Sequence, residues 1–507
     1  MCYIYCYMNI DDLGFLLTKI DEMAFTNPFG GRRDQLEAEI LARLGRESSA
    51  SGGNQLFTRD FNQVLRWIRI GEERLLQGVY KEFVSGSGVE RLASLAYFSL
   101  YHELVEDLDR LFEDREGNPV LNRKLFGKIE RGIRKRVSLT SPARNPLWEN
   151  PAHLFACFYQ LRRAFQCISR EIVGTSKPVR DLRVRVWESV FTQDMLGYQQ
   201  WMHESVGKFP TLVTGPTGSG KEVVARAIGL SRFIPYDAQS GQFASQPRES
   251  FRPVNLSALT ETLIESELFG HRKGSFTGAI RDRPGIFKSA GRYGTVFLDE
   301  IGEVPESIQV KLLRILQSGE FQSIGEEKNS FFEGKIIAAT HRDIKREVRE
   351  GRIREDFFYR ICGDQVNTVA LKDIVKAQPA EIAKSVRFIC SKLFGDDAAE
   401  ELSLRVVDRL GELVPKAYQW PGNFRELEQA VRNVIVRNEF VPVELEDSPC
   451  EIERTYLGSE VSLDKWNQLY AAKAYENFGS YREAARRLQV DQRTLKKWAT
   501  EVSAVAS

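Results

Sequence analysis

Residues Thr211 to Lys221 read TLVTGPTGSGK. The apolar run at the start predicts a strand and a helical pattern follows from Glu222 to Ile228, so the glycines lie between a strand and a helix, as a P-loop requires. In such a loop, backbone N–H groups and the helix N-terminus face a phosphate chain, and Lys221 reaches its β and γ phosphates. The bare GxxxxGK pattern also arises by chance, but these flanks predict an ATP site. We expect this site to be formed by Gly215, Gly218, Ser219, Gly220, Lys221 and Glu222.

A second stretch, Thr295 to Glu300, supplies carboxylates for nucleotide hydrolysis. It reads TVFLDE, an apolar run that ends in two acidic residues. A P-loop usually has Ser or Thr after its lysine to bind Mg²⁺, and with Glu222 in that place the metal must rely on another carboxylate. Asp299 is the expected Mg²⁺ ligand, and Glu300 is the group that orients or deprotonates the attacking water. Alone, such a pair is usually a solvated strand end; together with a P-loop it favours catalysis.

The chain is organised in several domains, as its 507 residues suggest. Between about 185 and 370, short apolar runs (TLVTG, RPVNL, TVFLDE, KIIAAT) alternate with helical stretches, which is typical of an α/β subdomain with a parallel sheet. A helical segment, 371–443, follows. An acidic linker at 444–453 then separates a small all-α terminus, 455–507.

The first 175 residues predict a mostly α domain. Apolar residues recur at helical spacing, and loop compositions interrupt them at 49–54, 84–88 and 138–146. The clearest apolar series is Leu92, Leu95, Phe98, Leu104, Leu108 and Leu111. No sensory module is indicated by a motif. A basic helical stretch at 123–136 is more simply a solvated helix face than an anion site.

The amino-acid composition limits where the protein is located in the cell and which partners it can bind. The 71 Lys and Arg residues nearly cancel the 70 Asp and Glu residues, so any nucleic-acid contact must be local. The seven cysteines are scattered without CxxC spacing, and the five histidines form no ligand pattern, which predicts reduced thiols and no structural zinc. Without a basic region at the start or an 18-residue apolar run, we expect neither signal peptide nor membrane span, and a cytoplasmic protein.

The stretch from Asn255 to Arg425 resembles the AAA+ domain of bacterial sigma-54-dependent transcriptional activators, the enhancer-binding proteins. NLSALTETLIESELFGHRKGSFTGA resembles the segment that leads into that family's GAFTGA loop, and GTVFLDEIGEVP resembles its Walker B region. A GKE ending of the P-loop is usual in the family. The resemblance implies an ATPase with a helical lid at 371–443, and a sigma-54 contact made by Gly274, Ser275, Phe276, Thr277, Gly278 and Ala279.

The resemblance also implies roles for single residues. Asn255 is similar to the strand asparagine that holds the catalytic glutamate, here Glu300, in an inactive pose. Thr340 resembles the sensor I residue that reads the γ-phosphate, and Arg425 resembles the sensor II arginine of the lid. Within RIREDFFYRI, two arginines resemble fingers that reach a neighbouring subunit's ATP site, which implies a ring. The implied catalytic set is Glu300, Asp299, Asn255, Arg354 and Arg360.

The chain departs from the family pattern at several places. His341 follows the sensor I threonine where the family usually has Asn, and Ser275 replaces the usual Ala of the loop. A basic LRER segment is missing at 370–382. An extra stretch, about 232–252, separates the P-loop helix from the next strand, and the sequence does not indicate its role.

The segment YREAARRLQVDQRTLKKW, Tyr481 to Trp498, has the pattern of a helix-turn-helix. A plain helical hairpin would share its apolar face, but the segment also resembles the Fis-type module of many sigma-54 activators. Asp491 can cap the second helix, and the stretch from Leu463 to Phe478 would pair two modules. From Gly479 to Trp498, six basic residues face two acids. The expected DNA-binding residues are Arg482, Arg486, Arg487, Gln492, Arg493, Lys496 and Lys497.

These patterns predict an activator that binds upstream DNA, assembles from dimers into a hexameric or heptameric ring, and uses ATP with Mg²⁺ to remodel sigma-54 RNA polymerase. One alternative is an AAA+ DNA-binding regulator that does not act through sigma-54; the retained Phe276 and Thr277 argue against it. Another is a general AAA+ protein remodeller, against which the terminal helix-turn-helix argues. The position of residues 1–175 ahead of the ATPase suggests regulation.

Overall fold

The computed structural model describes residues 8–43, 59–78, 88–114, 117–136, 148–247, 250–415, 418–442 and 463–503. The chain forms two compact units, Met1–Val441 and Pro442–Ser507. The three predicted interruptions before residue 147 and the linker at 444–453 lie wholly or largely outside the described residues. Within the described part of the chain, no helix has the length and apolarity to cross a membrane.

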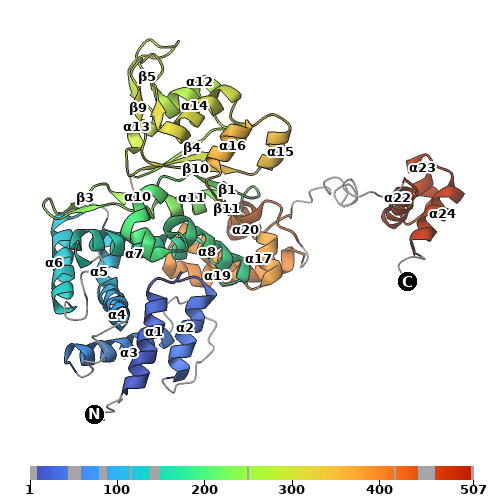
Figure 1. Ribbon diagram of the computed structural model, residues 1–507. Coiled ribbons are helices and arrows are strands. Elements are labelled where there is room, and N and C mark those ends of the chain that lie inside the picture. Colours follow the sequence, from blue (N-terminus) through green and yellow to red (C-terminus); the bar gives the residue numbers. More distant parts are fainter. Residues whose placement is uncertain are drawn as a thin grey trace. The chain divides into compact units, whose positions relative to one another are not determined.

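A sheet of parallel strands organises the first unit (Figure 1). It has five strands, in the order β11-β1-β10-β7-β4. Four of the strands are the predicted apolar runs, and the expected α/β fold is confirmed. The edge strand β11 is not among the predicted strands, because its sequence DQVN is mostly polar. The strands are β1 (Thr211–Thr214), β4 (Phe251–Asn255), β7 (Thr295–Asp299), β10 (Lys335–Thr340) and β11 (Asp364–Asn367).

The two faces of the sheet belong to two hydrophobic cores. Successive side chains of a strand point to opposite faces, so Phe297 packs in one core while its neighbours Val296 and Leu298 pack in the other. Helices on the Val296 face come from the chain after β4. They are α12 (Glu261–Phe269), α13 (Ile286–Ala290), α14 (Glu306–Ser318), α15 (Ile344–Arg349) and α16 (Glu355–Ile361).

The N-terminal part is helical, as predicted, and all six residues of the apolar series from Leu92 to Leu111 are buried. Asn9 caps the first helix by accepting a hydrogen bond from the backbone N–H of Asp12, at 2.7 Å. The helices are α1 (Ile10–Ala24), α2 (Gly31–Arg43), α3 (Arg59–Leu76), α4 (Gly88–Glu103), α5 (Val105–Glu113), α6 (Pro119–Arg136), α7 (Pro151–Glu171) and α8 (Lys177–Phe191). Short helices α9 (Met195–Gly197), η5 (Tyr198–Met202) and α10 (His203–Val206) lead into β1.

The N-terminal helices pack directly on the nucleotide-binding part. Helices α7 and α8 contact α11 (Lys221–Gly229), and α8 also contacts β11. One continuous core therefore runs from Leu13 in α1 to Val213 and Phe297 in the sheet.

The extra stretch at 232–252 contains a small hairpin, β2 (Tyr236–Asp237) and β3 (Gln242–Phe243). Its rings join an aromatic cluster with α7: Phe155 lies 4.7 Å from Tyr236 between ring centroids, and Tyr159 lies 4.7 Å from Phe243. In α6, the side-chain amide of Asn122 donates to the carbonyl oxygen of Gly241 at 3.1 Å. The extra stretch thus connects the P-loop helix and β4 to helices α6 and α7.

Helices after the sheet form the lid. Their own core includes Leu371, Val386, Leu427 and Val431. Glu381, which is buried, accepts a hydrogen bond from the backbone N–H of Thr175 at 2.9 Å, so the turn between α7 and α8 is fastened to the lid. The lid helices are α17 (Leu371–Ala377), α18 (Glu381–Phe394), α19 (Asp396–Leu413) and α20 (Asn423–Arg437).

The second unit is a three-helix module made of α22 (Leu463–Phe478), α23 (Tyr481–Leu488) and α24 (Gln492–Ser503). Ala484, Ala485 and Leu495 are buried at its centre. Gln489 ends α23 in the left-handed conformation, with φ of 55°. Asp491 caps α24 as predicted, since its carboxylate accepts a hydrogen bond from the backbone N–H of Arg493 at 2.8 Å.

Candidate nucleotide and DNA sites

The carboxyl ends of four parallel strands bring the predicted ATP-site residues together. The register pairs Thr214, which leads into the P-loop, with Thr340 on β10. It also pairs Asn255 with Asp299, and Glu300 follows Asp299 directly. Ligands of open parallel sheets bind at this edge, so residues that are far apart in the sequence share one site.

The P-loop backbone has the shape of a phosphate cradle. Gly215, Gly218 and Gly220 have φ values of 148°, 75° and 90°, a region that favours glycine. A Cβ at Gly218 would lie 2.3 Å from the carbonyl oxygen of Gly422, so this glycine also permits the lid to approach. Helix α11 begins at Lys221 and points its N-terminus at the loop. These features fit the triphosphate of a nucleotide.

Lys221 is folded back on the loop. Its ammonium donates to the carbonyl oxygens of Gly215 at 3.2 Å and Pro216 at 3.3 Å. Burial lowers the pKa of this amine, while Glu300 and Asp299 act in the opposite direction. The ammonium of Lys221 therefore lies near the carboxylates of Asp299 and Glu300. A bound phosphate chain would be a further negative partner for it.

Asp299 and Glu300 end strand β7 as a half-buried pair of acids. Burial first, and then the charge of Glu300, raise the pKa of Asp299. A divalent cation would offset both effects, so the carboxylate fits a Mg²⁺ ligand. No group of three or more His, Cys, Asp or Glu side chains in the described ranges could hold a metal alone, and a Mg²⁺ ion here would also need phosphate oxygens.

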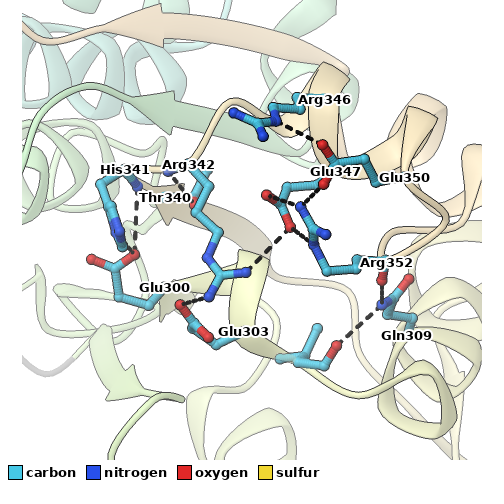
Figure 2. Close-up of polar contacts among 11 residues, drawn as sticks. Glu300, Glu303, Gln309, Thr340, His341, Arg342, Arg346, Glu347, Glu350 and Arg352 are labelled. Atoms are coloured by element: carbon cyan, nitrogen blue, oxygen red, sulfur yellow. Dashed lines mark hydrogen bonds and ion pairs between the residues drawn. The ribbon is translucent and has the colours of Figure 1, made fainter. Parts of the chain in front are cut away.

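The end of β10 carries a polar network, shown in Figure 2. The hydroxyl oxygen of the buried Thr340 accepts a hydrogen bond from the backbone N–H of Arg342 at 3.1 Å. Arg342 forms ion pairs with Glu303 and Glu347, and Arg352 pairs with Glu347 at 2.5 Å. The network thus joins the predicted sensor strand to the loop that precedes α16.

Asn255 is placed differently from the expectation. Its side-chain oxygen accepts hydrogen bonds from the backbone N–H and the hydroxyl of Ser257, at 3.0 and 2.8 Å. Among the described residues, the side chain that contacts the carboxylate of Glu300 is instead His341. The asparagine of the neighbouring strand forms no hydrogen bond with the glutamate in this structure, and its side-chain oxygen faces Ser257 of its own turn.

An apolar cavity of about 200 Å³ opens beside Ser219 and Gly220. Its walls come from the α7–α8 turn, the start of α11 and the lid, and its surface is suited to the base of a nucleotide. These walls carry no sequence motif, since they are isolated apolar residues from distant segments. They include Ile172, Val173, Val179, Leu182, Val223, Ile374, Phe388 and Phe424.

The lid reaches the P-loop through hydrogen bonds that no sequence motif predicts. The backbone N–H of Phe424 donates to the carbonyl oxygen of Gly218 at 3.0 Å. The hydroxyls of Ser219 and Thr368 lie 2.6 Å apart. Arg425, the predicted lid arginine, is exposed. It lies beside the P-loop, since a Cβ added at Gly218 would be 3.2 Å from the Cβ of Arg425. Glu222, the other predicted contact, is exposed in the first turn of α11.

Of the two predicted finger arginines, Arg354 is the N-cap of helix α16 and Arg360 lies in its last turn. Arg354 pairs with Glu306 at 3.1 Å and with Asp356 at 2.9 Å. Arg360 is exposed and contacts no acidic side chain in the part of the chain that the structure describes. The second arginine is therefore available to an outside group, and the first would have to leave two acids.

The stretch GSFTGA forms the tip of a hairpin between β5 (Gly270–His271) and β6 (Arg283–Pro284). Backbone hydrogen bonds close its turns. The N–H of Gly274 donates to the carbonyl oxygen of Ala279 at 2.9 Å, and the N–H of Ala279 donates to the carbonyl oxygen of Phe276 at 3.0 Å. The Phe276 ring packs edge-on to His271, whereas Thr277 is exposed. Figure 1 shows this hairpin at the end of the first unit remote from α1.

A second hairpin, β8 (Glu320–Phe321) and β9 (Ser330–Phe331), lies beside the GSFTGA hairpin. The guanidinium of Arg272 bridges the two, since it pairs with Asp282 at 2.7 Å and with Glu326 at 2.5 Å. Glu326 belongs to the turn between β8 and β9. The GSFTGA tip is thereby supported at its base.

The predicted DNA-binding residues lie on the surface of the second unit, and all seven are exposed. Arg486 and Arg487 both approach Glu483, at 2.6 and 3.5 Å. Gln492 and Arg493 begin helix α24, which follows the turn. This is the arrangement that a helix-turn-helix needs, with exposed residues at the start of its second helix.

The fold and the site define the class: an AAA+ P-loop ATPase with a helical lid. Comparison with known proteins narrows the class, because residues 192–367 match the family described as Sigma-54 interaction domain. This central part of the chain is thus similar to sigma-54 interaction domains.

Individual relatives agree with this assignment. The chain is 37% identical over 222 residues to the DNA-binding transcriptional regulator NtrC of Azospirillum brasilense, covering 44% of this chain and 42% of that protein. It is 41% identical over 228 residues to the Nif-specific regulatory protein of Klebsiella pneumoniae, covering 45% and 40%. The chain spans less than half the length of these curated relatives. A solved structure, NtrX from Brucella abortus, aligns with 73% of this chain and 79% of its own at 22% identity, with a TM-score of 0.39, a likeness too distant to carry an argument.

Proposed function

We propose that the protein is a sigma-54-dependent transcriptional activator, which binds DNA upstream of its promoters and uses ATP hydrolysis to remodel sigma-54 RNA polymerase. The observation that carries the proposal is the convergence of Lys221, Asp299 and Thr340 at one sheet edge, within a domain whose GSFTGA hairpin projects from the same fold.

ATP hydrolysis would use the residues at the carboxyl edge of the sheet. Lys221 and the P-loop N–H groups would bind the phosphates, and Thr340 would sense the terminal one. Asp299 would hold Mg²⁺, which supplies charge neutralisation when bound. Glu300 would hydrogen-bond to the attacking water and accept its proton. The apolar cavity beside Ser219 would receive the base.

A ring would complete each ATP site. A phosphoryl-transfer site needs a fixed positive charge near the terminal phosphate in the transition state. Arg360 is exposed and free of acidic partners in the described ranges, and it would supply that charge to a neighbouring subunit, with Arg354 beside it. We therefore propose a hexameric or heptameric ring, built from DNA-bound dimers, with low ATPase activity in the isolated monomer.

The remaining contacts would involve the polymerase and DNA. The GSFTGA tip would contact sigma-54 through Phe276 and Thr277, with the glycines allowing its turns. Arg482, Arg486 and Arg487 would bind phosphates, and the start of α24 would read bases. Since both partners act on chromosomal DNA, we place the protein in the cytoplasm.

The decisive experiment measures promoter opening. Purified protein is added to sigma-54 holoenzyme on a promoter with its upstream site, with ATP or with a non-hydrolysable analogue. Open complexes should form only with ATP. The same assay with holoenzyme carrying the major sigma factor tests the alternative of a regulator that does not act through sigma-54. Opening that ignores sigma-54, or none with either polymerase, would reject the proposal.

A further inference from the structure

The carboxylate of Glu300 is held by a histidine. The Nδ1 atom of His341 lies 2.7 Å from Oε2 of Glu300, and the backbone N–H of the same histidine approaches that oxygen at 3.4 Å (Figure 2). Among the described residues, no other side chain forms a hydrogen bond or an ion pair with this carboxylate. A ring that carries its hydrogen on Nδ1 can donate a hydrogen bond to this carboxylate oxygen.

The backbone conformation of Glu300 also restricts where its side chain can point. Glu300 has φ of 56° and ψ of 50°, a left-handed conformation that is uncommon outside glycine. Its N–H donates to Oδ1 of Asp299 at 3.1 Å. A strained backbone at one end and His341 at the other leave the carboxylate little freedom to turn.

His341 is itself set firmly at the end of strand β10. It follows the buried Thr340, and the next residue, Arg342, is anchored by Glu303 and Glu347. The ring is therefore carried by a backbone that is fixed on both sides. A hydrogen bond from such a donor restricts its acceptor at low entropic cost.

We infer that His341 is a positioning residue for ATP hydrolysis: it fixes Glu300 through Oε2, so that Oε1 is presented to the attacking water. This inference rests on the proposed function of Glu300 as the group that orients the water. It assigns to His341, through a different strand, the contact with the glutamate that Asn255 does not make in this structure.

The test compares substitutions in the full-length protein. H341A removes the donor, while H341N keeps an amide N–H that can take the place of Nδ1. H341A should lower kcat roughly 100-fold, the scale for misplacing a reacting group by about 1 Å. The KM for ATP and the binding of a fluorescent ATP analogue should be unchanged, and H341N should recover most of the lost kcat. Arg346→Ala, which breaks an exposed ion pair in the next helix, is the control for general disturbance and should keep the wild-type kcat.

A double-mutant cycle separates this role from a structural one. Because His341 acts through Glu300, the variant E300Q should be no slower when H341A is added. Additive losses, a kcat for H341A that equals or exceeds that of the wild type, or failure of H341N to restore kcat would overturn the inference. The proposed function fails separately: E300Q with wild-type turnover would reject the role of Glu300 itself, whatever His341 does.

Discussion

The side-chain amide of Asn423, at the start of lid helix α20, donates a hydrogen bond to the carbonyl oxygen of Thr217 in the P-loop at 2.9 Å. The oxygen of the same amide accepts from the backbone N–H of Leu371 at 2.9 Å, where the lid begins. Asn423 is buried and has φ of 54°. One side chain thus joins the phosphate loop to the first and the last helix of the lid.

Replacing this asparagine with glycine should weaken nucleotide binding. N423G keeps the positive φ without strain and removes both hydrogen bonds, each worth about 1 kcal/mol. The affinity for ATP should fall by roughly 5- to 30-fold, as measured by titration with a fluorescent analogue. N438G is the matched control, because Asn438 has a similar φ of 56° at the other end of α20. Equal affinities in the two variants would contradict a clamping role for Asn423.

Motifs with a fixed spacing made much of this fold predictable. The P-loop, TVFLDE and KIIAAT locate three strands whose carboxyl ends must meet in a parallel sheet, and Asp491 marks a helix start. Thr368, Asn423 and the cavity walls could not be found in this way, since their roles depend on tertiary contacts between distant segments. The contact between His341 and Glu300 depends on side-chain conformations, which the sequence does not predict. The sequence shows only that His341 stands where the family usually has Asn.

The contact of the GSFTGA tip with sigma-54 should be separable from ATP hydrolysis. Thr277 is exposed, and the loop closes through backbone hydrogen bonds that do not use its side chain. T277A should therefore hydrolyse ATP at the wild-type rate yet fail to open a sigma-54 promoter, as followed by permanganate footprinting. R281A is the matched control, because Arg281 is exposed on the same hairpin outside the GSFTGA stretch and should keep wild-type opening. A T277A variant with full opening activity would show that the tip does not engage the polymerase through this residue.

Two arginines of the second unit should affect DNA binding in different ways. Arg493, at the start of α24, is placed to read a base, and R493A should cost about 1–3 kcal/mol at the specific site only. Arg482, at the start of α23, is placed to contact phosphate. R482A should weaken specific and non-specific binding alike, with a salt slope smaller by about 1. Fluorescence anisotropy over a range of salt concentrations distinguishes them, and identical salt slopes and specificity ratios in both variants would disprove this division of roles.

Stability should depend on pH through Lys335 of strand β10. Its side chain is 3% exposed, donates to the carbonyl oxygen of Phe209 at 2.7 Å, and lies near Arg232 and Asp364. Burial, together with Arg232, lowers the pKa of this amine to about 7. In the unfolded chain the amine keeps its proton up to about pH 10. Between these two values the unfolded state binds more protons, so Lys335 makes the protein more stable as pH rises from about 7.

The substitution K335M isolates this contribution. Methionine has no proton to lose, so K335M should lack the rise of about 2 kcal/mol that Lys335 adds between pH 7 and pH 9. Any stability advantage of K335M over the wild type should be largest at pH 7 and shrink towards pH 9, as followed by urea unfolding. Met at 335 leaves the Phe209 carbonyl without its donor, which shifts the difference by a constant amount but does not change its slope with pH. Lys345, exposed on α15, provides the control K345M, whose difference from the wild type should be flat. A flat difference for K335M as well would mean that Lys335 keeps its proton in the folded protein.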